Sequence, residues 1–185
     1  SILRQDPDVL LIGEIRDQET ADIAVKFSMT GHLVFSTVHA NDAPSTISRL
    51  LDLGIPPFLL GSSLNLIMAQ RLVRTIDPDE KQEDNPSKED LDRLGITDSS
   101  SMKFFKGNPT QKNHNSGYKG RTAIHEILEV NSSIRDMVFD GKSETDIRAQ
   151  AIKNGMTPLR DAGIDKINEG LTTVEEILRA TVEDN

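Results

Sequence analysis

The chain of 185 residues contains no cysteine, no tryptophan and only one tyrosine. Without cysteine it can form neither disulfide bonds nor a metal site built from thiolates. The scarcity of aromatic side chains removes the platforms on which proteins stack nucleic-acid bases. The formal net charge of −9 argues further against nucleic acid as a direct partner, because polyanions are held by basic surfaces.

Long hydrophobic runs are also missing. Runs such as Val9 to Ile12 are far too short to span a bilayer, and no signal peptide opens the chain. We therefore expect an acidic protein of the cytoplasm. The length corresponds to one domain with room for a small second one.

Strand and helix signals alternate in the first part of the chain. Val9 to Ile12 is a continuous apolar run, typical of a strand buried on both faces, and residues 32–38 predict a second strand. Between them, Asp17 can cap a helix over about residues 18–30, which Gly31 can end. Strands separated by helices imply a parallel sheet, so the predicted fold class is α/β.

Later segments predict further elements. Pro44 suits the first turn of a helix that stops at Gly54, and Ser62 to Val73 predicts a helix running into a short strand. Thr173 and Glu176 have the spacing of a capping box at the start of a last helix.

The composition changes at Asp77, since residues 77–90 hold seven acidic and only two basic residues. We expect residues 77–116 to be an acidic, mobile insert, with at most one short helix from Ser87 through Leu94.

The pattern becomes helical from Asn131 to the end. The predicted organisation is an α/β portion over residues 1–130 followed by a small helical subdomain over 131–185.

Two polar residues follow the predicted strands directly. Glu14 comes after the first strand and Gly13, and His39 comes after the second. Because parallel strands present their carboxyl ends at one edge, which is where open α/β folds bind ligands, these side chains should lie over one cleft. A carboxylate there can polarise water, and a histidine can hydrogen-bond a charged ligand oxygen. Either residue alone could equally be structural.

Four segments carry a resemblance to a known family. Together they resemble the secretion ATPase superfamily, the hexameric cytoplasmic motors of type II secretion and type IV pilus assembly. The segments are DPDVLLIGEIRDQETADIA (6–24), TGHLVFSTVHANDAPSTISRLLDLGI (30–55), AQRLVR (69–74) and GYKGRTAIHEIL (117–128). The resemblance implies part of a RecA-like parallel sheet with flanking helices. The tail over residues 155–181 looks like the secretion and pilus-extension branch.

The resemblance also implies roles for single residues. In the Walker B match, Glu14 is the catalytic carboxylate that activates water, and Gly13 stands beside the nucleotide. In the match to the histidine box, His39 contacts the γ-phosphate and His32 helps to shape the box. Arg16 and the neighbouring Asp17 match as well, as hexamer contacts or as braces of the loop.

Three arginines match motifs that lie near the nucleotide in the family, namely Arg71, Arg74 and Arg121. Cations there make physical sense, because phosphoryl transfer needs its charge neutralised. The alternative for each is an ordinary surface ion pair.

The phosphate loop of the family is missing. Gly141-Lys142-Ser143 is the only Gly-Lys-Ser, but Asp136 occupies the place of the required first glycine. The resemblance implies ATP and Mg²⁺ as cofactors of a longer subunit, of which we expect this chain to be the C-terminal part, inactive alone.

A zinc loop found in many relatives is absent too. By spacing, its cysteines would fall near Asp77, Glu80, Thr110 and Asn113, none of which is a thiolate. Asp77, Glu80 and His114 could form a site of hard ligands, but scattered ligands on a loop seldom hold structural zinc, so we expect none.

The function implied is that of a homo-hexameric ATPase that powers type II secretion or type IV pilus assembly. It would work at the inner face of the bacterial cytoplasmic membrane, associated with it peripherally through platform proteins. Two alternatives stay open. One is a pilus-retraction or DNA-uptake motor of the same superfamily. The other is a non-catalytic docking module, which the missing phosphate loop would favour.

Overall fold

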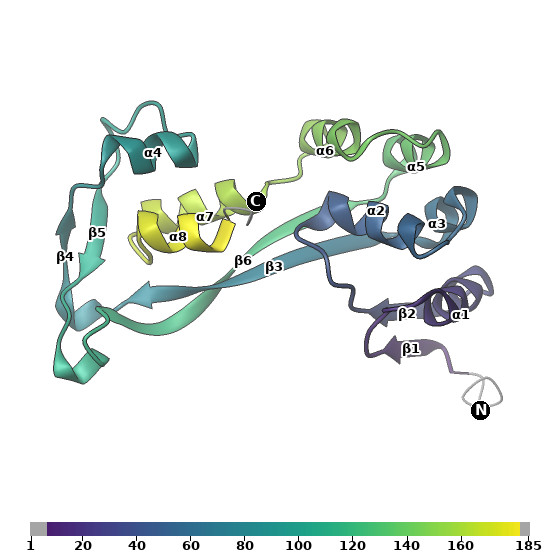
Figure 1. Ribbon diagram of the computed structural model, residues 1–185, viewed down its shortest axis with the longest axis horizontal. Helices are drawn as coiled ribbons and strands as arrows, with labels where there is room; N and C mark the ends of the chain where they lie inside the picture. The colour runs from purple at the N-terminus through teal and green to yellow at the C-terminus, as the bar shows by residue number, and fades with distance from the viewer. Residues whose placement is uncertain (1–6, 182–185) are drawn as a thin grey trace. The chain divides into compact units, whose positions relative to one another are not determined.

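A computed structural model describes residues 7–181, which form a mixed α/β structure of helices α1–α8 and strands β1–β6 (Figure 1). The described residues group into two compact units. The first contains the residues up to Met68 together with Ile127–Met156. The second contains Ala69–Glu126 and the residues from Thr157 onward.

This grouping differs from the predicted division at residue 130. The segment after residue 130 is helical, as predicted, but its helices are shared between the units. Helices α5 (Ser132–Phe139) and α6 (Glu144–Lys153) belong to the first unit. Helices α7 (Leu159–Asn168) and α8 (Val174–Thr181) belong to the second.

The first unit begins with the predicted pair of parallel strands. Strand β1 (Val9–Ile12) pairs with β2 (Leu33–Ser36), from Val9 opposite Leu33 to Ile12 opposite Ser36. Helix α1 (Gln18–Met29) connects them and packs against β2. The predicted parallel β–α–β order is therefore confirmed.

The predicted limits of α1 are also confirmed. Asp17 caps the helix by accepting a hydrogen bond of 2.8 Å from the Thr20 N–H. Gly31 follows the helix with a φ of +96°, a conformation that favours glycine.

Burial of β1 on both faces is not observed. Leu10 is buried, but the Leu11 side chain, on the opposite face, is 76% exposed. Val9 of the same strand and Leu33 and Phe35 of β2 are also about half exposed, so one face of this strand pair is open among the described residues.

Helices α2 (Ala43–Asp52) and α3 (Pro57–Ser63) follow. The predicted helix from Ser62 is wrong for most of its length, because residues from Leu66 onward form β3 (Leu66–Ile76), an eleven-residue strand. Strand β3 pairs with β6 (Tyr118–Glu129). Pairing with the distant strand β6 makes this segment a strand and not a helix. In a sheet, its β-branched side chains lie on a pleated surface on which they pack well.

Helices α5 and α6 are joined by the Gly141-Lys142-Ser143 turn. Ser143 caps α6 and accepts a hydrogen bond of 3.2 Å from the Asp146 N–H. The Gly-Lys-Ser sequence therefore lies between two helices, not between a strand and a helix. This placement confirms that it is not a phosphate loop.

The second unit packs α7 and α8 against β3 and β6. Its core contains Val73, Ile124 and Ile177, all essentially inaccessible to solvent. Leu94 and Ile96 join this core from the acidic segment.

The acidic segment 77–116 carries regular structure where we expected mainly an irregular insert. It forms β4 (Lys81–Asp84) paired antiparallel with β5 (Phe104–Gly107), and α4 (Lys88–Leu94), which Ser87 caps as predicted. Short 3₁₀ turns, η2 (Pro78–Glu80) and η3 (Gln111–Asn113), flank the hairpin. The reason is that α4 contacts α8 and buries its few aliphatic side chains there.

The base of this segment is held by one buried amide. Asn113 Nδ2 donates to Asp77 Oδ2 at 3.3 Å and to the Asn108 carbonyl at 2.9 Å. Its Oδ1 accepts from the N–H groups of Thr110 at 2.8 Å and Gly117 at 3.2 Å. All four hydrogen-bonding sites of the amide are thus used. Asp77, Thr110 and Asn113 are three of the four positions at which the zinc loop would have cysteine.

Neither a metal cluster nor a membrane span is found between residues 7 and 181. No group of three or more His, Cys, Asp or Glu residues in that range is arranged to hold a metal ion. No helix in the same range is long and apolar enough to cross a bilayer.

Candidate functional site

Glu14 and His39 meet at the carboxyl ends of β1 and β2. His39 Nε2 lies 2.7 Å from Glu14 Oε1. The Glu14 side chain is 20% exposed, while the His39 side chain is 87% exposed. The prediction that both lie on one edge of a parallel sheet is therefore confirmed, and the imidazole is the more accessible of the two groups.

Arg16 is the second partner of Glu14. Its Nη2 lies 2.5 Å from Glu14 Oε2, so the carboxylate is held between a guanidinium and an imidazole. The hydrogen bond from Arg16 lowers the pKa of Glu14 against a smaller opposing effect of desolvation, and the charges of Arg16 and His39 lower it further. Glu14 is consequently ionised at neutral pH, as a group that orients and polarises water must be.

Two other residues predicted near this edge have local contacts. Asp17 is the cap of α1. His32 Nδ1 lies 2.9 Å from Thr30 Oγ1 and 3.1 Å from the Phe27 carbonyl oxygen, and its ring meets the Phe27 ring edge-on. These contacts brace the last turn of α1.

Gly13 has open space where a side chain would begin. A Cβ atom built on it would meet no heavy atom within 4 Å, apart from its own chain neighbours. Packing within the described residues therefore does not require glycine here. A ligand that approaches the backbone closely would require it.

Thr37 is a residue of this edge that the sequence did not single out. Its hydroxyl donates a hydrogen bond of 2.7 Å to the Gly13 carbonyl. The sequence feature that could have pointed to Thr37 is its hydroxyl side chain at the end of an apolar strand, two positions before His39.

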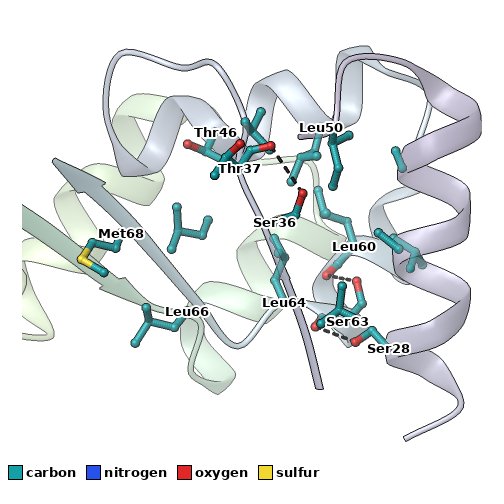
Figure 2. Close-up of a pocket in the computed structure, with 17 residues that line it drawn as sticks. Ser28, Ser36, Thr37, Thr46, Leu50, Leu60, Ser63, Leu64, Leu66 and Met68 are labelled. Carbon is teal, nitrogen blue, oxygen red and sulfur yellow. Dashed lines mark hydrogen bonds between the residues drawn. The ribbon is translucent and has the colours of Figure 1, made fainter. Parts of the chain in front are cut away.

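A cavity of about 280 Å³ lies in the first unit (Figure 2). Its lining is mainly aliphatic, with hydroxyl groups from residues that include Ser28, Ser36 and Thr37. In Figure 2, Leu66 and Met68 lie on one side of the cavity and Ser28 on the other. Through Thr37 the cavity reaches the edge that carries Glu14.

The three predicted arginines belong to the second unit, whereas Glu14 and His39 belong to the first. Arg71 donates a hydrogen bond of 3.2 Å to the Gln70 carbonyl oxygen. Arg121 is exposed on β6.

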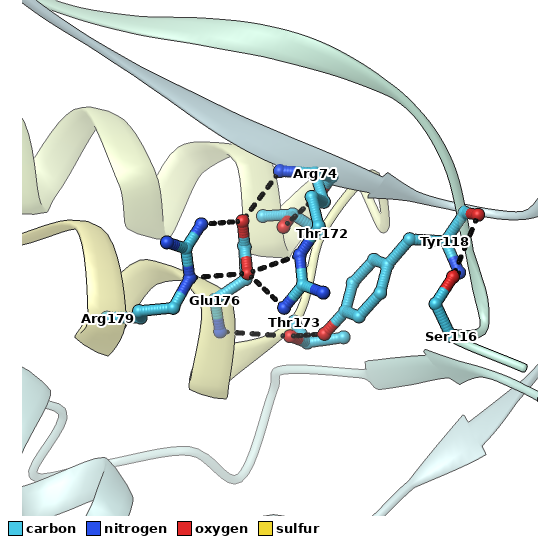
Figure 3. Close-up of polar contacts among 7 residues, drawn as sticks. All are labelled: Arg74, Ser116, Tyr118, Thr172, Thr173, Glu176 and Arg179. Carbon is cyan, nitrogen blue, oxygen red and sulfur yellow. Dashed lines mark hydrogen bonds and ion pairs between the residues drawn. The ribbon is translucent and has the colours of Figure 1, made fainter. Parts of the chain in front are cut away.

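Arg74 is engaged by Glu176, as Figure 3 shows. The Arg74 backbone N–H donates to Glu176 Oε1 at 2.8 Å, and Arg74 Nε and Nη2 donate to Oε2 at 2.9 and 2.8 Å. Arg179 binds the same carboxylate from the next turn of α8. Burial by itself would raise the pKa of Glu176, but the hydrogen bonds from Arg179 and Arg74 outweigh it and lower the pKa to about 2.

Tyr118, which is partly buried, also contacts this group. Its ring lies 4.1 Å from the Arg74 guanidinium carbon, and its hydroxyl lies 2.8 Å from Thr173 Oγ1. Burial raises the pKa of Tyr118. The predicted capping box is only half present: Thr173 accepts from the Glu176 N–H, but the Glu176 carboxylate binds the two arginines instead.

A family model described as "Type II/IV secretion system protein" matches residues 1–179. The chain belongs to this family. It is 44% identical to the type IV pilus assembly ATPase PilB of Thermus thermophilus, over 99% of this chain and 21% of that protein. It is 43% identical to the type II secretion system ATPase E of Vibrio cholerae, over 99% of this chain and 36% of that protein.

Solved structures of other ATPases share the fold. The crystal structure of the pilus retraction motor PilT with bound ADP matches with a TM-score of 0.67 at 25% identity, over 99% of this chain and 42% of that one. This likeness confirms the predicted α/β class, part of a RecA-like domain with flanking helices. The chain spans between about a fifth and two fifths of the lengths of these three proteins.

Proposed function

We propose that this chain supplies the water-activating and phosphate-sensing edge of a hexameric ATPase that powers type II secretion or type IV pilus assembly. The observation that carries the proposal is the 2.7 Å contact between Glu14 and His39 at the carboxyl ends of two parallel strands. Nucleotides bind at such edges in open α/β folds.

In this proposal Glu14 and His39 have different roles. Glu14 is ionised and partly shielded from solvent, so it can orient a water molecule for attack on the terminal phosphate. His39 is exposed and can donate a hydrogen bond to a γ-phosphate oxygen, which couples the presence of that phosphate to Glu14.

ATP with Mg²⁺ is the proposed cofactor. Mg²⁺ takes oxygen ligands and commonly receives several from phosphates and water. Since the described residues hold no cluster of three or more metal-ligating side chains, they fit an ion that arrives with the nucleotide rather than one in a protein cage. Gly13 carries no side chain that would obstruct the nucleotide. The Arg74 guanidinium is already bound by Glu176, so Arg74 is not among the proposed phosphate contacts.

The relatives support assembly or secretion over retraction. Identity is 43–44% with PilB and ATPase E but 25% with the retraction motor PilT. The proposed partners are five further copies of the subunit and platform proteins of the inner membrane, at its cytoplasmic face. Arg16 and Asp17 brace the loop after β1 in this proposal.

The test is Glu14→Gln in the complete subunit. The substitution keeps the shape of the side chain but removes the charge that orients water. We expect nucleotide affinity to stay within a few-fold and steady-state hydrolysis to fall by roughly 10²-fold or more. A fully active variant would remove Glu14 from the mechanism. Hydrolysis with no dependence on either Glu14 or His39 would refute the proposed site.

A further inference from the structure

We infer that Thr37 is a positioning residue that holds Glu14 against His39, an assignment that rests on the proposed ATPase function. Thr37 comes directly after β2 and two residues before His39. It touches neither side chain of the pair in the contacts described. Its influence runs through the backbone on both sides of Glu14.

Two hydrogen bonds connect Thr37 to the residues that flank Glu14. The Thr37 hydroxyl donates to the Gly13 carbonyl at 2.7 Å. The Thr37 carbonyl accepts from the Ile15 N–H at 2.9 Å. The peptide units before and after Glu14 are therefore both tied to one residue at the end of the neighbouring strand.

This arrangement matters because the β1–β2 pairing itself ends at Ile12 and Ser36. Beyond that point one backbone hydrogen bond, from the Ile15 N–H to the Thr37 carbonyl, still joins the two segments, and Gly13 has no side chain to restrict its backbone. The hydrogen bond from the Thr37 hydroxyl to the Gly13 carbonyl joins the two segments one residue beyond the paired strands. It therefore fixes the direction in which the chain leaves the sheet at Glu14. Thr37 is β-branched, which limits the rotamers its hydroxyl can adopt.

The two hydrogen bonds of Thr37 bear on where the Glu14 carboxylate lies. Glu14 reaches Arg16 with one carboxylate oxygen and His39 with the other, at 2.5 and 2.7 Å. Oε1 is buried and accepts no aligned hydrogen bond, so its position beside His39 depends on where the backbone places Glu14. A shift of about 1 Å in a catalytic group can cost on the order of 10²-fold in rate.

The experiment compares three variants of the complete subunit. Thr37→Val keeps the shape and removes the donor, Thr37→Ser keeps a hydroxyl, and Thr46→Val is the matched control. Thr46 lines the same cavity, but its hydroxyl donates to the Asp42 carbonyl within the first turn of α2. We expect Thr37→Val to lower kcat by roughly tenfold with KM for ATP within about twofold. Thr37→Ser should recover most of the rate, and Thr46→Val should keep it.

A second readout does not depend on hydrolysis. In the 185-residue chain, the Glu14 carboxyl can be titrated by carbon-detected NMR. Arg16 and His39 hold the pKa of this carboxyl below its ordinary value. We expect Thr37→Val to move that pKa upward, toward the ordinary value, and Thr46→Val to leave it in place.

The outcomes separate the inference from the function on which it rests. Wild-type kcat and an unmoved Glu14 titration in Thr37→Val would overturn the positioning role, whatever Glu14→Gln does. Equal losses in Thr37→Val and Thr46→Val, or a rise in KM that matches the fall in kcat, would overturn it as well. A fully active Glu14→Gln would overturn the proposed function instead.

Discussion

His39 Nε2 lies 2.7 Å from Glu14 Oε1, although the two residues follow different strands and are separated by the whole of α1. The pair is not isolated, because Arg16 holds the other carboxylate oxygen. The hydrogen bond from Arg16 keeps this carboxylate ionised, whereas its buried Oε1, beside His39, accepts no aligned hydrogen bond.

The pH dependence of hydrolysis should respond to Arg16. Because Arg16 lowers the pKa of Glu14, the active ionised form exists above that lowered pKa and is lost as the pH falls through it. Arg16→Gln raises the Glu14 pKa toward its ordinary value, so the acidic limb of the kcat profile should move to higher pH. The measurement is kcat against pH for the complete subunit. Lys26→Gln, in the last turn of α1, is the control and should leave the limb unmoved. An acidic limb that stays in place in Arg16→Gln would contradict the role of this ion pair.

Glu176 should be a major contributor to the stability of the second unit. Its side chain has no exposed surface and binds Arg74 and Arg179, whose side chains are 40% and 58% exposed. Glu176→Ala leaves the Arg74 backbone N–H without its acceptor and removes the shared counter-ion of two guanidinium groups that water can still reach. We expect a loss of about 2 kcal/mol. Arg179→Gln should cost about 1 kcal/mol, because Arg179 is largely exposed and Arg74 still holds the carboxylate. Urea denaturation measures both values, and equal losses in the two variants would contradict this account.

The same carboxylate predicts an acid-dependent loss of stability. The folded-state pKa of Glu176 is about 2, below the ordinary value of 4.5. A lowered folded-state pKa contributes stability that is fully present above about pH 4.5 and is lost as the pH falls toward 2. Glu176→Gln should therefore show a shallower decline of unfolding free energy over this range than the wild type. Parallel declines would show that Glu176 titrates normally.

Asn113 should hold the base of the acidic segment without a metal ion. Asn113→Ala leaves the Thr110 and Gly117 N–H groups and Asp77 Oδ2 without the amide, and we expect a loss of about 2 kcal/mol. Asn85→Ala, at an exposed position between β4 and α4, is the matched control and should change little. Dialysis against a chelator should not alter the unfolding free energy of the wild type. One stoichiometric zinc that survives dialysis would contradict this prediction.

The 185-residue chain alone should neither bind ATP tightly nor hydrolyse it. A phosphate loop supplies most of the N–H donors and the lysine that hold the β- and γ-phosphates. Within this sequence the only Gly-Lys-Ser caps a helix. Calorimetric titration with a non-hydrolysable ATP analogue is the measurement. Micromolar affinity would mean that other residues of the chain build the nucleotide site.

Much of the candidate site could be predicted from the sequence because its signals are local. The apolar run of β1, the Asp17 cap and Gly31 define strand, helix and turn within a few residues of each other. The parallel pairing then places Glu14 and His39 at one edge as a geometric necessity. The likeness of four motifs to one family is the basis of the roles proposed for these residues, which spacing alone leaves open.

Tertiary structure decided the features that depend on distant partners. Leu66 to Val73 follows a helix in sequence but becomes a strand because β6 pairs with it. The acidic segment has few aliphatic residues, yet Leu94 and Ile96 complete a core whose other members lie far along the chain.

Glu176 has one contact that the local sequence predicted and others that only the tertiary structure decided. Its spacing from Thr173 predicts a capping box, and Thr173 does cap its N–H. Its carboxylate, however, binds Arg74, which lies on a strand remote in sequence, because a fully buried charge is costly unless it is paired and hydrogen-bonded. Local patterns therefore determined where β1, α1 and β2 begin and end, and with them the edge that carries Glu14 and His39. The fold determined which charged groups meet, because their pairing depends on burial that no short stretch of sequence specifies.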